Sequence, residues 1–114
     1  MHELLSSCGC VQLPLLHTQF NTTFFGFDET AGRFAQVSID TCKHCGSHWL
    51  HYAYEIEGIS YSGKWFRVPI TAKDIVLITP MNAAAFLCNQ PWYFYGGSYF
   101  NSTGAKSSVP LTQL

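Results

Sequence analysis

The sequence predicts a mainly β domain of the α+β class, with an antiparallel sheet of about four strands in two hairpins and one short helix near the C-terminus. Three observations support this fold class. Apolar and polar residues alternate over several segments, turn-forming residues separate those segments, and hydrophobic residues make up 47% of the 114 residues, enough for one core. We therefore expect a single domain over residues 1–100 and a polar tail over residues 101–114.

The first hairpin is expected in the first third of the chain. The run TTFFGF at 22–27 is rich in strand-forming residues, and the turn-prone DETAG at 28–32 follows it. The next run, RFAQVSID at 33–40, alternates small or branched apolar residues with mostly polar ones. The pair is therefore expected to cover a core with one face and to present a largely polar face on the other side.

A second hairpin is expected in the middle of the chain. In HWLHYAYEIEG at 48–58, one face carries Leu50, Tyr52, Tyr54 and Ile56, and the other carries Trp49, His51, Ala53, Glu55 and Glu57. A Ser-Gly pair at 62–63 favours a turn, and KWFRVPIT at 64–71 again alternates. These segments predict two more antiparallel strands.

One short helix is expected after the second hairpin. Thr79 fits an N-cap, Pro80 fits the first helical position, and Pro91 stops the segment. The apolar residues that recur at helical spacing between them are Met81, Ala84, Ala85 and Cys88. The preceding run, DIVLI at 74–78, is compatible with either a strand or the start of a helix.

Two short cysteine pairs predict a metal site. Residues two apart in an extended segment point to the same side, so Cys8 and Cys10 can face one ion. Cys42 and Cys45 have the two-residue gap of a tight metal-binding turn, and Gly46 allows a positive backbone angle just after it. Structural zinc sites take such thiolates in a tetrahedron, so we expect these four cysteines to bind one Zn²⁺ that staples the N-terminal segment to the sheet.

The sequence CKHCG at 42–46 resembles the zinc knuckle of zinc-ribbon-like domains, whose pattern is C-x-x-C-G. This resemblance implies a small zinc-binding domain and carries no activity with it. If one cysteine is not a ligand, His44 or His48 is the nearest replacement. A redox C-x-x-C normally begins a helix in a βαβ unit, and no helix is expected after Cys45, so a redox role is disfavoured.

Composition and charge exclude several classes of partner. Charged residues are only 11% of the chain and the formal net charge is -1, so no basic field is present to attract nucleic acid. No apolar run approaches the roughly 18–20 residues that span a membrane, and residues 1–16 lack the pattern of a secretory signal. We therefore expect a cytoplasmic protein, in which reduced cysteines favour metal binding over disulfides.

An aromatic surface is expected near the Gly-Gly pair at 96–97. The run PWYFYGGSYF at 91–100 predicts an extended segment that bends at these glycines. Exposed aromatic patches often mark interaction sites, which favours a protein partner or a homodimer. The candidate residues are Trp65, Trp92, Tyr93, Tyr95, Tyr99 and Phe100.

These patterns favour a protein-interaction module, of an immunity or adaptor type, over an enzyme. The motifs of zinc deaminases, nucleophile elbows, phosphate-binding loops and zinc proteases do not occur, and we assign no catalytic residue. The alternative is a zinc- or cysteine-dependent enzyme of unknown substrate. Four cysteine ligands leave zinc without an open position for water, so the number of ligands distinguishes the two functions.

Overall fold

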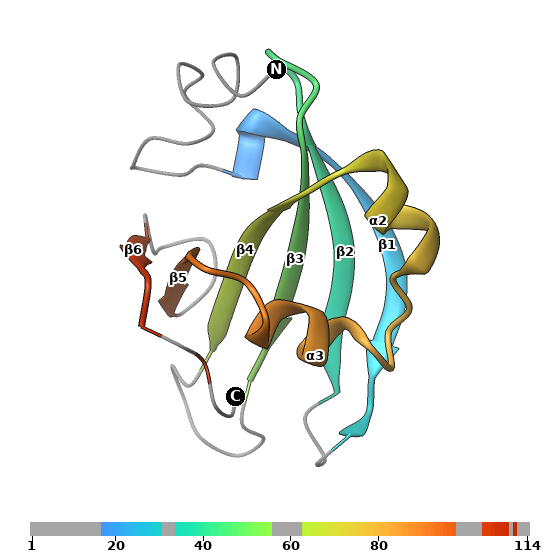
Figure 1. Ribbon diagram of the computed structural model, residues 1–114, viewed down its shortest axis with the longest axis vertical. Coiled ribbons are helices and arrows are strands. Elements are labelled where there is room, and N and C mark those ends of the chain that lie inside the picture. The colour runs from blue at the N-terminus through green and yellow to red at the C-terminus, as the bar shows by residue number, and fades with distance from the viewer. Residues whose placement is uncertain (1–16, 31–33, 56–62, 98–103, 110, 112–114) are drawn as a thin grey trace.

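The computed structural model describes residues 17–30, 34–55, 63–97, 104–109 and 111, and its main feature is one antiparallel sheet. Each strand pairs with the next one along the chain, in the order β1-β2-β3-β4-β5-β6 (Figure 1). The strands are β1 (Phe20–Asp28), β2 (Ala35–Cys42), β3 (His48–Tyr54), β4 (Lys64–Ile70), β5 (Tyr93–Gly97) and β6 (Ala105–Ser107). The helical elements are the 3-10 turn η2 (His17–Gln19) and the helices α2 (Ala72–Leu77) and α3 (Ala83–Cys88).

The mainly β, antiparallel class is confirmed, and both predicted hairpins are present as β1–β2 and β3–β4. The expectation of about four strands is wrong, because β5 and β6 extend the same sheet. In β5 only three residues precede the two glycines, and β6 consists of three residues in total. Neither strand is long enough to show a clear alternation of apolar and polar side chains. β6 lies within the range expected to be a polar tail, and it is defined by its pairing with β5.

The described chain also contains two short helices where the sequence predicted one. Residues 74–78, which pattern alone left open, belong mostly to α2. Its N-terminus has a capping box: Asp74 N–H donates to the Thr71 hydroxyl at 3.3 Å, and Thr71 N–H donates to the Asp74 carboxylate at 2.8 Å. The predicted helix begins at Ala83 rather than at Pro80. A turn precedes it, in which Thr79 N–H donates to Asn82 Oδ1 at 2.8 Å.

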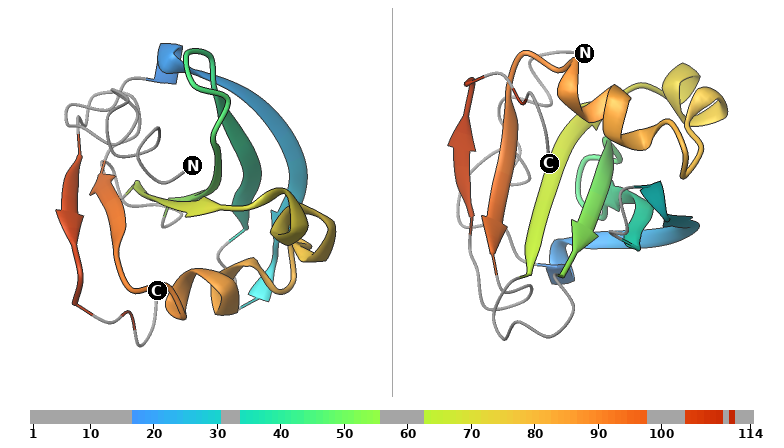
Figure 2. Two further views of the ribbon diagram at one scale, coloured as in Figure 1. Left: turned by 45° about the horizontal axis from the view of Figure 1, so that its top comes forward. Right: turned by 90° about the horizontal axis from the view of Figure 1, so that it is seen from below.

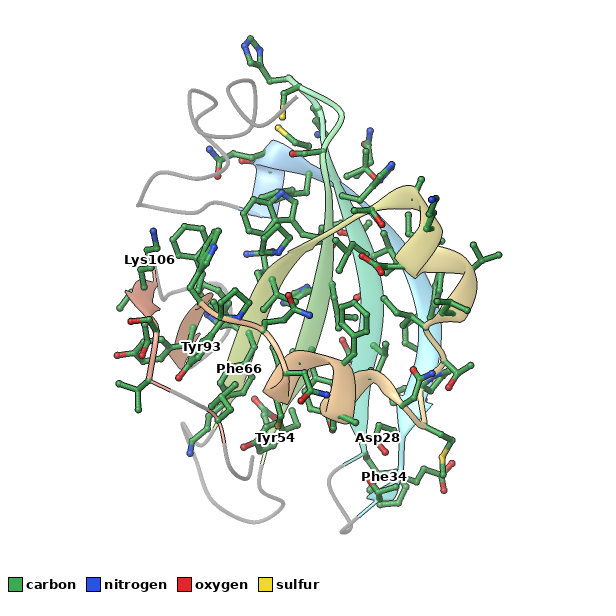
Figure 3. All side chains as sticks on the ribbon, viewed as in Figure 1. Asp28, Phe34, Tyr54, Phe66, Tyr93 and Lys106 are labelled. Atoms are coloured by element: carbon green, nitrogen blue, oxygen red, sulfur yellow. The ribbon has the colours of Figure 1, made fainter. Side chains whose placement is uncertain are left out.

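Each face of the sheet carries a buried core. The first face is the one that α2 and α3 cover (Figure 1), and it packs against Ile78, Ala83 and Leu87. Tyr54, Phe66 and Tyr93 lie on this face (Figure 3). The sheet residues of the first-face core are Ala35, Val37, Ile39, Leu50, Tyr52, Tyr54, Phe66, Val68, Ile70 and Tyr93.

The second face carries an aromatic core of its own. Its buried members are Phe20, Cys42, Trp49, Ala53, Trp65 and Phe94. The face of β2 that was expected to be largely polar does carry polar residues, but two of them, Ser38 and Asp40, are buried. Asp40 is tolerated there because other strands supply partners for its carboxylate.

The sheet is strongly twisted and curved across its width, from β1 at one edge to β6 at the other (Figure 2). A register shift between Phe24 and Gly26 interrupts the pairing of β1 with β2. Gly26 has φ 142°, and a Cβ there would lie 2.8 Å from Pro80 Cγ. Glycine at this bulge therefore lets the connection between α2 and α3 pack directly on β1.

No helix in the described ranges is long and apolar enough to cross a membrane.

Candidate metal centre

Cys42 and Cys45 lie in the tight turn that connects β2 to β3. Cys42 ends β2, and β3 begins at His48. Gly46 N–H donates to the Cys42 carbonyl at 2.9 Å, and Cys42 N–H donates to the Ser47 carbonyl at 2.9 Å. Gly46 has φ 77°, a left-handed conformation that glycine adopts without strain. The backbone of C-x-x-C-G is thus closed into a compact loop by its own amides.

The two cysteines lie on the same side of the sheet. Cys42 is buried in the second-face core, and Cys45 is half-buried and packs against that core. Cys45 Sγ lies 3.0 Å from Ser47 Oγ, which also accepts a hydrogen bond from Trp49 Nε1 at 3.3 Å. The structure therefore brings together one of the two predicted ligand pairs, next to a hydroxyl and an indole N–H.

Cys8 and Cys10 lie outside the described residues. The described chain begins close to the cysteine turn, because Lys43 N–H donates to the Gln19 carbonyl at 2.9 Å. Cys10 precedes Gln19 by nine residues, a stretch that can span up to roughly 30 Å when extended. The covalent length of the chain therefore allows Cys8 and Cys10 to reach the turn.

The described ranges contain no group of three or more histidine, cysteine or acidic residues that could hold a metal ion. His48, one of the two suggested replacement ligands, lies on the first face because its side chain alternates with that of Trp49. Its Nδ1 lies 3.0 Å from the Thr41 hydroxyl. His44 is exposed in the turn. Sheet geometry therefore directs His48 away from Cys42.

A polar cluster, which sequence reasoning missed, lies on the second face beside the turn at residues 42–46; its two charged members, Asp40 and Arg67, are buried. We call it the Asp40 cluster; its members are Thr22, Asp40, His51 and Arg67, one from each of β1 to β4. Arg67 Nε donates to Asp40 Oδ2 at 2.7 Å, and the Thr22 hydroxyl donates to Asp40 Oδ1 at 2.7 Å. His51 Nδ1 lies 3.4 Å from Asp40 Oδ2.

Within the Asp40 cluster, burial has its largest electrostatic effect on the pKa of His51. The Arg67 guanidinium carbon lies 4.6 Å from the centre of the Phe20 ring and 5.2 Å from that of Trp65, so aromatic faces flank the cation. Burial lowers the pKa of His51 from 6.5 to about 4, the positive charge of Arg67 adds to that effect, and the Asp40 carboxylate opposes it. His51 is therefore neutral at pH 7, and the cluster is an ion pair with a neutral imidazole beside it.

His51, which the sequence places on the same strand face as Glu55, lies opposite Arg67 across β3 and β4. Glu55 is exposed just after β3 ends. The sequence did carry one signal of this cluster. Along each strand, its member alternates with the residues of the first-face core and therefore faces away from that core. Only the strand register shows that these positions meet.

The predicted aromatic surface divides into core and exposed residues. Trp65 and Tyr93 are buried, Trp92 is half-buried, and Tyr95 is 41% exposed. Tyr99 and Phe100 lie outside the described residues. Rings with a larger exposed fraction occur instead around the β1–β2 hairpin, at Phe24, Phe27 and Phe34, which are 55%, 48% and 60% exposed. Phe34 and Asp28 lie at the end of the sheet where β1 ends and β2 begins (Figure 3).

Comparison with known protein families, with curated proteins and with solved structures finds no match to this chain.

Proposed function

We propose that this protein is a small zinc-binding protein whose structural site is formed by Cys8, Cys10, Cys42 and Cys45, and that the folded domain acts as a protein-interaction module. The observation that carries the zinc proposal is the turn at residues 42–46. It joins two strands, places both of its cysteines on one side of the sheet, and has glycine at the position with positive φ.

Four thiolates complete the tetrahedral shell of Zn²⁺, which leaves no open position for a water nucleophile. Such a site stabilises a fold and does not catalyse hydrolysis. Here the ion would join the segment before η2 to the turn between β2 and β3. Because this cross-link exists only in the folded chain, the free energy of metal binding contributes to the stability of the domain.

Metal analysis of the purified protein tests the site. We expect one zinc ion per chain in the wild type and none in Cys42→Ser or Cys45→Ser. Cys88→Ser is the matched control, because Cys88 lies in α3 on the other face and should leave the zinc content unchanged. A wild-type protein that folds fully in zinc-replete medium without bound metal would contradict the proposal.

The interaction surface that we propose is the exposed aromatic side of β1. The rings of Phe24 and Phe27 pack edge to face with their centroids 5.1 Å apart, and both remain about half exposed. Among the described strands, β1 has β2 as its only neighbour, so its outer edge is a place where a further strand can pair. The partner is another protein or a second copy of this chain, and apolar contact would recognise it.

A further inference from the structure

A chain of hydrogen bonds leads from the aromatic core of the second face to Cys45. An indole N–H can only donate, so Ser47 Oγ accepts from Trp49 Nε1 at 3.3 Å. At the other end, a zinc-bound thiolate can only accept a hydrogen bond. In the metal-bound protein the Ser47 hydroxyl must therefore point its proton at Cys45 Sγ, 3.0 Å away.

The indole that begins this chain is held rigidly. Trp49 is fully buried, and its ring stacks on Phe94 with the centroids 5.7 Å apart and the planes at 29°. Trp92 and Phe20 pack edge to face on the same indole, with centroids 6.1 Å and 6.5 Å away. Core packing thus sets the direction of the Nε1–H bond. Because the Ser47 oxygen accepts this hydrogen bond, its position is set as well.

We propose that Ser47 is a positioning residue for the zinc site: its hydroxyl donates to the Cys45 thiolate, and Trp49 holds that hydroxyl in place. This inference rests on the proposed zinc site. Donors that hydrogen-bond to a metal ligand orient it and tune its charge, and their loss typically costs about 10–100-fold in metal affinity. The second-face core would therefore adjust the affinity of the site although none of its rings touches the metal.

The test is a zinc titration against a chromophoric chelator, with the same set of variants titrated with Co²⁺. We expect Ser47→Ala to bind zinc about 10–100-fold more weakly than the wild type. It should also shift the sulfur-to-cobalt charge-transfer band to longer wavelength, because the thiolate loses a hydrogen bond. Ser47→Thr keeps the hydroxyl and should restore both properties, which separates positioning from a general effect on folding.

Thr41→Val is the matched control, because the Thr41 hydroxyl is one residue from Cys42 but bonds His48 on the first face. It should leave the zinc affinity and the cobalt band unchanged. If the wild type binds zinc and Ser47→Ala binds it equally well with the same cobalt band, the positioning role is wrong and the zinc site stands. If the wild type binds no zinc, the site itself is wrong.

Discussion

Arg67 and Asp40 form an ion pair across an intervening strand: the Nε atom of Arg67 on β4 lies 2.7 Å from Oδ2 of Asp40 on β2, and β3 lies between them. Both side chains are buried on the second face. A buried ion pair of this kind adds little net stability compared with an apolar pair, but removal of one partner leaves the other charge without compensation.

We expect Arg67→Met to lower the free energy of unfolding by about 3–5 kcal/mol, because the Asp40 carboxylate would be left buried without its cation. The double variant Asp40→Asn with Arg67→Met should lose less than the sum of the two single variants. Urea denaturation of the four proteins measures this coupling. Lys64→Met, which removes an exposed cation from the same strand, should have little effect. Additive losses in the cycle would show that the two side chains act independently.

The low pKa of His51 predicts a loss of stability in acid. The unfolded chain binds a proton at this histidine near pH 6.5, whereas the folded protein resists protonation until about pH 4. The contribution of His51 is therefore complete above pH 6.5, falls as the pH drops through that window, and is lost below pH 4. The total change is on the order of 3 kcal/mol.

Urea denaturation of the wild type and of His51→Gln between pH 7 and pH 4 measures this effect. The difference in slope between the two proteins isolates His51, because acid release of the proposed zinc ion would affect both. An imidazole that titrates near pH 6.5 in the folded protein, followed by NMR, would contradict the predicted environment.

Removal of the metal should destabilise the protein. The proposed zinc ion binds the folded chain alone, so a chelator strong enough to extract it should lower the melting temperature, and added zinc should restore it. Differential scanning calorimetry with and without the chelator measures the shift. The melting temperature of Cys42→Ser should already be low and should not respond to the chelator. An unchanged wild-type melting curve after verified metal removal would rule out a stabilising role.

The proposed interface predicts that substitutions of its exposed rings weaken association but change the folding free energy only slightly. Phe24→Ser and Phe27→Ser remove exposed rings, so each should cost about 1 kcal/mol or less of folding free energy, most of it from their mutual contact. Association, measured by light scattering or by binding to a captured partner, should be weakened. Phe94→Ala, in the second-face core, should instead cost about 3–5 kcal/mol.

Tyr95→Ser tests the surface that the sequence predicted near residues 96–97. If Tyr95→Ser weakens association and the two β1 variants do not, the interface lies on β5 rather than on β1. Unchanged association in all three variants would contradict an aromatic interface in the described part of the chain.

The sequence alone was sufficient to predict the hairpins β1–β2 and β3–β4 and the turn at residues 42–46. Alternation in β2, β3 and β4 is a local property that each strand carries in its own residues, and the spacing of Cys42 and Cys45 is equally local. The capping box of Thr71 and Asp74 was also readable, and it would have identified α2 over a strand.

Only the tertiary structure shows which polar side chains meet on the second face of the sheet. Asp40 and Arg67 are separated by 27 positions, and their contact depends on the register of three strands, which no local pattern specifies. The burial of the second face likewise depends on what packs against it. β6 is a strand because β5 offers it hydrogen-bonding groups, since three residues have no propensity strong enough to form a strand alone.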